Sequence, residues 1–109
     1  MSDRLTIWLK GSGPVRIDTA KWPTVVNDSW TDGLTDCTFS IRKHQDGRMI
    51  ISGSAKIIGN TPTRVSTLLE KTESADDLLK KATDLASEVN LPREAIQDLI
   101  APLLAVDLD

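Results

Sequence analysis

Residues 37–58 read CTFSIRKHQDGRMIISGSAKII, and this stretch decides the fold. Two runs of alternating apolar and polar residues flank Asp46-Gly47, a dipeptide typical of hairpin turns. A three-residue loop over 45–47, with Gly47 in the left-handed conformation, brings the apolar residues of both runs onto one face. The facing pairs are then Cys37–Ala55, Phe39–Gly53 and Ile41–Ile51. The sequence therefore predicts an antiparallel hairpin in this register.

The predicted register gives the hairpin one apolar and one polar face. On the apolar face we expect these residues to be buried: Phe39, Ile41, Met49, Ile51 and Ile57. On the polar face, Arg42, His44 and Lys56 point away from the core. The simplest interpretation of this face is a solvated sheet surface, because antiparallel sheets commonly leave one face to water. The alternative is an anion- or nucleic-acid-binding ribbon at the hairpin tip, formed by Arg42, Lys43, His44 and Arg48.

The segment before this hairpin predicts two further strands. Apolar residues at every second position of 5–9 indicate a half-buried strand, and the glycine-rich turn at 11–14 leads into a second strand over 15–18. Between Trp22 and Trp30 the apolar residues follow a helical spacing, with Pro23 suited to a first turn. We expect a short helix there, although the β-branched residues at 24–26 suit a strand equally well.

The segment after the hairpin has the apolar spacing of helices. We expect a short helix over 61–69, a longer helix that Ser74 caps and Asn90 ends, and a last helix from Pro92. The inner residues of the first of these helices are Val65, Leu68 and Leu69. Pro102 is expected to kink or stop the last helix, because proline lacks the backbone donor that a helix needs.

These elements predict an α+β fold: an antiparallel sheet of about four strands within residues 4–58, with two or three C-terminal helices packed on one face. The 109 residues, 39% of them hydrophobic, are enough for one domain over 1–109 with a core of its own. One cysteine and one histidine exclude an intramolecular disulfide and a Cys/His zinc site. Cys37 and His44 also fall on opposite faces of their strand, so they form no catalytic pair. We therefore predict no catalytic residue, no metal and no cofactor.

Charge divides the chain, because residues 1–60 carry a net charge of +2 and residues 61–109 a net charge of −5. Within the acidic part, residues 84–100 read DLASEVNLPREAIQDLI and resemble the helix-turn-helix pattern of bacterial repressors, with Asn90 in the turn. The resemblance implies a DNA-binding regulator that presents Arg93 and Gln97 on its recognition helix. A net charge of −3 over residues 75–101 opposes this function, because DNA affinity depends on neutralising phosphates.

The leading hypothesis is a small non-enzymatic regulatory or adaptor protein that acts through protein–protein contacts and forms a homodimer, because its basic sheet face and acidic helices are complementary. The alternative is the DNA-binding regulator that uses residues 84–100. A third possibility is a small-ligand binder with a pocket lined by Trp8, Trp22 or Trp30.

Two further observations bear on class and location. Trp22-Pro23 and the stretch HQDGR at 44–48 are similar to short uncharacterised proteins of bacterial genomes and mobile elements, and this resemblance implies no activity. The sequence has no signal peptide and no apolar run as long as a membrane span. We therefore expect a cytoplasmic protein without membrane contact.

Overall fold

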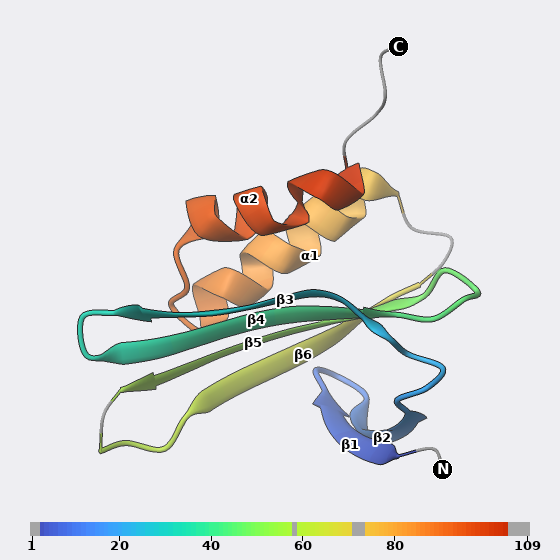
Figure 1. Ribbon diagram of the computed structural model, residues 1–109, viewed down its shortest axis with the longest axis horizontal. Helices are drawn as coiled ribbons and strands as arrows, with labels where there is room; N and C mark the ends of the chain where they lie inside the picture. Colours follow the sequence, from blue (N-terminus) through green and yellow to red (C-terminus); the bar gives the residue numbers. More distant parts are fainter. Residues whose placement is uncertain (1–2, 58, 71–73, 105–109) are drawn as a thin grey trace.

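Figure 1 shows the computed structural model of the chain, in which two helices cover one face of a curled sheet and an N-terminal hairpin lies against the other face. The structure describes residues 3–57, 59–70 and 74–104. In this part of the chain the strands are β1 (Arg4–Leu9), β2 (Gly13–Asp18), β3 (Thr24–Asp32), β4 (Thr35–Lys43), β5 (Met49–Ile57) and β6 (Thr63–Leu69). The helices are α1 (Ala75–Glu88) and α2 (Arg93–Leu104). The fold is therefore α+β, as expected.

The β4–β5 hairpin has the predicted register. Cys37, Phe39 and Ile41 face Ala55, Gly53 and Ile51, and Gly47 adopts a positive φ of 103° in the three-residue loop. The burial prediction is confirmed for Phe39, Ile41 and Ile51, which are fully buried, whereas Met49 is half-buried. It is wrong for Ile57, which is 51% exposed because it ends β5 outside the cluster that the helices cover.

Two segments expected as helices are strands. Most of the Trp22–Trp30 segment belongs to β3, which begins at Thr24 and has a register shift between Thr24 and Val26, and most of the expected helix over 61–69 is β6. The sheet therefore has six strands rather than about four, in the order β2-β1-β6-β5-β4-β3. It is also mixed rather than purely antiparallel, because β1 runs parallel to β6. In the described residues, that parallel register consists of one pair, Leu9 and Ser66.

The helices bury the apolar face of β4, β5 and β6. Ser74 caps α1 in a reciprocal arrangement with Asp77, and Asn90, at a φ of 58°, ends the turn after the helix as predicted. α2 continues through Pro102 to Leu104, so the proline does not stop it at that position. The helices contribute these fully or nearly fully buried residues: Leu78, Ala82, Leu85, Ala86, Ile96 and Ile100. They pack on the fully buried sheet residues Phe39, Ile41 and Ile51.

A second, smaller core lies on the opposite face of the sheet. Leu9 and Ile17 of the β1–β2 hairpin pack there with Trp22 and Ile50. Ile50 belongs to the face expected to be solvated, yet only 2% of it is exposed. The β1–β2 hairpin covers one end of this face and leaves the rest open (Figure 1).

Candidate functional site

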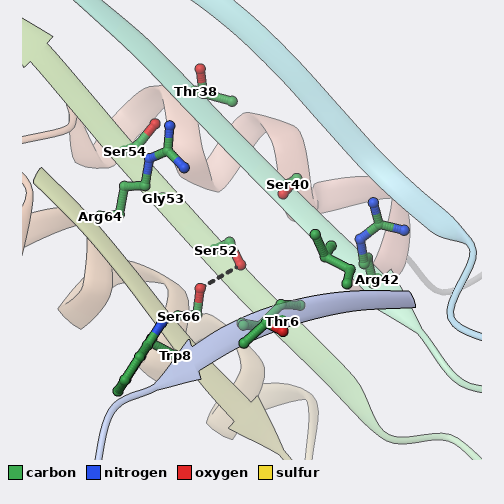
Figure 2. A pocket seen from close by; sticks show the side chains of 12 residues that line it. Thr6, Trp8, Thr38, Ser40, Arg42, Ser52, Gly53, Ser54, Arg64 and Ser66 are labelled. Carbon is green, nitrogen blue, oxygen red and sulfur yellow. Dashed lines mark hydrogen bonds between the residues drawn. The ribbon is translucent and has the colours of Figure 1, made fainter. Parts of the chain in front are cut away.

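The open part of the second face forms a cleft of about 450 Å³ between β1 and the strands β4, β5 and β6 (Figure 2). We call it the polar cleft. It is lined by Leu5, Thr6, Ile7 and Trp8 of β1, Thr38, Ser40 and Arg42 of β4, Ser52, Gly53 and Ser54 of β5, and Arg64 and Ser66 of β6. All four strands are consecutive in the sheet order, but among the described residues β1 pairs with β6 only at Leu9 and from there crosses over β5 (Figure 2).

Small hydroxyl side chains form the floor of the polar cleft. Strand alternation directs the even-numbered residues of β4, β5 and β6 away from the helices, and five of them are serine or threonine. The Ser52 and Ser66 hydroxyls lie 2.8 Å apart in a hydrogen bond across β5 and β6. These side chains are short and leave space above the floor. Their hydroxyl groups offer hydrogen-bond donors and acceptors to a ligand.

Two arginines flank this floor. Figure 2 shows Arg42 and Arg64 on either side of the Ser52–Ser66 pair. Arg42 Nη1 donates to the Trp22 carbonyl oxygen at 3.1 Å, which fixes its side chain at one end of the polar cleft. Arg64 is exposed at the other end. None of the twelve lining residues is acidic, so the polar cleft favours an anionic ligand.

Apolar side chains of β1 form the rim of the polar cleft. Trp8 is 71% exposed and Leu5 is 38% exposed, although both belong to a strand whose other apolar residues are packed. An exposed indole beside arginines and hydroxyls provides both apolar contact area and one hydrogen-bond donor. Such a combination is typical of binding surfaces rather than of a solvated sheet.

The residues predicted at the hairpin tip are largely engaged with one another. The Arg48 guanidinium lies 5.0 Å from the centre of the Trp22 ring, and the His44 ring meets the same indole edge-on at 5.0 Å. Asp46 accepts from Arg48 Nε at 2.8 Å and from the Arg48 backbone at 3.0 Å. The Arg48 backbone donor, followed by its guanidinium, holds the pKa of Asp46 below the usual range. This cluster stabilises the turn rather than presenting three free groups.

The six predicted binding residues do not form one site. Arg42 lines the polar cleft, Lys43 is exposed at the end of β4, and His44 and Arg48 pack on Trp22. Arg93 and Gln97 are exposed on α2, and Figure 1 shows α2 on the face of the sheet opposite the β1–β2 hairpin. Only Arg42 of this set therefore belongs to the polar cleft.

Cys37 lies on the helix side, away from His44. Its thiol is buried in the main core. Burial, together with the negative charges of Asp32 and Asp36, raises the pKa of the thiol, which keeps it protonated and weakly nucleophilic. Within the described residues, no group of three His, Cys, Asp or Glu side chains is placed to hold a metal ion.

Sequence reasoning missed most of the polar cleft because β1 is far from β4, β5 and β6 along the chain and because β6 was expected to be a helix. Arg64 and Ser66 fall in a segment expected to be helical, so they could not be placed beside Ser52. Trp8 was expected only as one of three tryptophans that could line a ligand pocket. One signal was present in the sequence, namely the short hydroxyl residues along the polar face. A purely solvated surface is usually rich in Lys and Glu instead.

Comparison of the chain with family models, with curated proteins and with solved structures finds no match. In the part of the chain that the structure describes, no helix has the length and apolar character needed to cross a membrane.

Proposed function

We propose that this protein is a non-enzymatic regulatory or adaptor protein that binds an anionic segment of a partner protein in the polar cleft. One observation carries the proposal: two arginines and a floor of hydroxyls, with no carboxylate among the lining residues, lie beside an indole that is 71% exposed. The main core behind β4 and β5 is buried, and we expect its packing to keep the floor rigid. A rigid surface loses little conformational entropy on binding.

A protein partner fits the charge distribution better than a nucleic acid does. The polar cleft supplies two cations, whereas tight nucleic-acid binding neutralises several phosphates along a basic stripe. The chain as a whole carries a net charge of −3, and the exposed residues of α2 include Glu94 and Asp98. These charges disfavour the DNA-binding alternative through residues 84–100.

The proposed function is tested by titrating the full chain with oligoglutamate and, separately, with a single-stranded oligonucleotide. Isothermal calorimetry measures affinity, and indole fluorescence, to which Trp8, Trp22 and Trp30 all contribute, gives a second signal of binding. We expect Arg64→Gln to weaken oligoglutamate binding about tenfold, since a charge-assisted hydrogen bond contributes about 1.5–3 kcal/mol. Arg93→Gln is the matched control, because it removes the same charge on the opposite side of the sheet. Equal losses in both variants, or tighter binding of the oligonucleotide, would overturn the proposal.

Self-association is a second candidate, favoured by the nine-residue strand β3 at the end of the sheet order. An edge strand offers unpaired backbone groups to a second copy. Asp28 lies between Val26 and Trp30 on the same face of β3 and places a charge there. We expect light scattering at micromolar concentration to give twice the 11.9 kDa chain mass, and Asp28→Val to strengthen the association. A monomer in both proteins would contradict this candidate.

A further inference from the structure

The hydrogen bonds of β1 show which of its two edges is free. The Thr19 amide donates to the Asp3 carbonyl at 2.9 Å, so odd-numbered residues direct their backbone groups toward β2. Consistent with this, Pro14, which has no amide hydrogen, faces Trp8. On the other edge, the Lys10 amide donates to the Ser66 carbonyl at 2.8 Å. The even-numbered residues Thr6 and Trp8 therefore direct their backbone groups toward this second edge.

The second edge of β1 is paired at only one end. Leu9 and Ser66 form the single β1–β6 pair among the described residues, and the Lys10 side chain also forms an ion pair with Glu88 of α1. From there toward its N-terminus, β1 crosses over β5 toward Arg42 (Figure 2). No strand in the described part of the chain pairs with the second edge at Thr6, and Thr6 lines the polar cleft.

We infer that the polar cleft takes an extended, acidic segment of a partner protein, which adds to the free edge of β1 as a further strand. This inference rests on the proposed function and names the form in which the partner binds. Strand addition uses main-chain hydrogen bonds for affinity and alternate side chains for specificity. In the polar cleft, the backbone of Thr6 supplies the main-chain hydrogen bonds, and the arginines beside the floor select the side chains.

The polar cleft also specifies the side chains of the added strand. Residues of such a strand alternate between the floor and the outer surface, as the residues of β1 do. Those that face the floor meet the hydroxyls between Arg42 and Arg64, so acidic residues at every second position fit there. The intervening residues lie on the outer surface. Four residues of β1, Leu5 to Trp8, line the polar cleft, which indicates a short recognition segment.

A nucleic acid matches the positive charge of the polar cleft but cannot pair with the free edge of β1 as a strand does. Phosphates can pair with the two arginines, and a base can stack on Trp8. The backbone of Thr6, however, presents one donor and one acceptor in the geometry of a β-strand, and a peptide backbone matches both. The free edge therefore favours a polypeptide.

The decisive probe is an alternating Glu-Thr octapeptide in two N-methylated forms, one methylated on the Glu amides and the other on the Thr amides. The two sets of amides point to opposite edges of an extended peptide, so only one form blocks pairing with β1. We expect that form to bind at least about tenfold more weakly than the other by calorimetry. A Lys-Thr octapeptide, with the charge reversed, should not bind. Equal affinities of the two methylated forms would overturn strand addition and leave the proposed function standing.

Substitutions in β1 test the same inference from the protein side. Thr6→Pro removes an amide that pairs with no strand in the described part of the chain, so the fold should tolerate it, whereas Thr6→Val keeps the amide and the branched side chain. We expect Thr6→Pro to lose peptide binding at least about tenfold, and Thr6→Val to retain it. Should Thr6→Pro unfold, slowed hydrogen exchange of the Thr6 amide on peptide binding decides the question in the unmodified chain. If peptide binding leaves the hydrogen exchange of the Thr6 amide unchanged, strand addition is contradicted. If Arg64→Gln leaves the affinity for oligoglutamate unchanged, the proposed function itself is contradicted.

Discussion

The two faces of the central sheet are covered to different extents. The helices cover the centre of one side, where Phe39, Ile41 and Ile51 are fully buried. The other side is covered by β1 and β2 at one end, where Ile50 is buried, and open farther along, where Ser52 and Ser54 are half-exposed. Along β5, Ile51 therefore packs against the helices, whereas Ile50 packs in the second core and Ser52 and Ser54 line the polar cleft. A partial cover of this kind leaves a concave polar surface that is held in place by the packed face behind it.

Replacing Ile51 and Ile50 by alanine, one at a time, compares the two cores within one strand. Ile51→Ala opens a cavity in the main core and should cost about 4 kcal/mol, whereas Ile50→Ala, beside the open cleft, should cost about 2 kcal/mol. The smaller core relaxes more easily and lies closer to water. Urea unfolding gives both free energies of unfolding. Equal losses would mean that the β1–β2 hairpin packs as tightly as the helices.

Gly53→Ala tests how closely the helices approach the sheet. A Cβ atom at this position would lie 2.5 Å from Leu85 Cδ2 and 3.1 Å from Leu91 Cδ1, so the helix side must move. We expect a cost of about 2 kcal/mol from overpacking. Combined with Leu85→Ala, the substitution should cost less than the sum of the two single changes, in a double-mutant cycle of urea unfolding. Strict additivity would show that Leu85 does not limit the space at Gly53.

Acid should destabilise the fold by protonating two carboxylates, those of Asp46 in the β4–β5 turn and of Asp77 at the start of α1. The Ser74 backbone amide, followed by its hydroxyl, holds the pKa of Asp77 below the usual range, as Arg48 does for Asp46. Both pKa values lie below the ordinary Asp value of about 3.9, so this stabilisation is present above that pH and is lost as the pH falls through the folded values. The urea midpoint should therefore stay level from neutral pH and fall in acid. Asp46→Asn with Asp77→Asn should lower the midpoint at neutral pH and flatten its fall.

The smallest effect is expected on the floor of the polar cleft. Ser52→Ala removes the hydrogen bond to Ser66, but water can reach the hydroxyl that remains. We expect a loss of about 0.5 kcal/mol in the free energy of unfolding. Ser66→Ala should behave alike, and both variants together should lose little more than either alone. A loss as large as that of Ile50→Ala would show that the floor is structural and that its polarity serves the fold.

The β4–β5 hairpin could be predicted because its signals are local. Turn residues and strict alternation fix its register, and the polar cap at Ser74 likewise marks the start of α1. The error at 61–69 has a physical cause in the sheet itself. Leu69 faces the main core and Leu68 packs on the second core, so neighbouring residues are both apolar and the two-residue period is lost. The spacing of Val65, Leu68 and Leu69 then matches a helix.

The polar cleft could not be predicted, because it depends on which strands meet. Thr6 and Arg64 are brought together by the curl of the sheet, which no local pattern encodes. Ile50, an apolar residue in an otherwise polar row, was the one sign that something covers that face. It indicated the cover but not the strand that provides it.

The β1–β6 pairing also has a consequence for the folding pathway. All other strand pairs join segments that are neighbours along the described chain, whereas this one closes a loop that contains every other strand. Contacts of long sequence separation carry the largest loop-closure entropy and form late in folding. During synthesis the β1–β2 hairpin emerges before β3 to β6, yet its docking site is complete only once β6 has been made. The polar cleft is therefore expected to be among the last features to form, and a bound partner would selectively stabilise chains that have completed their sheet.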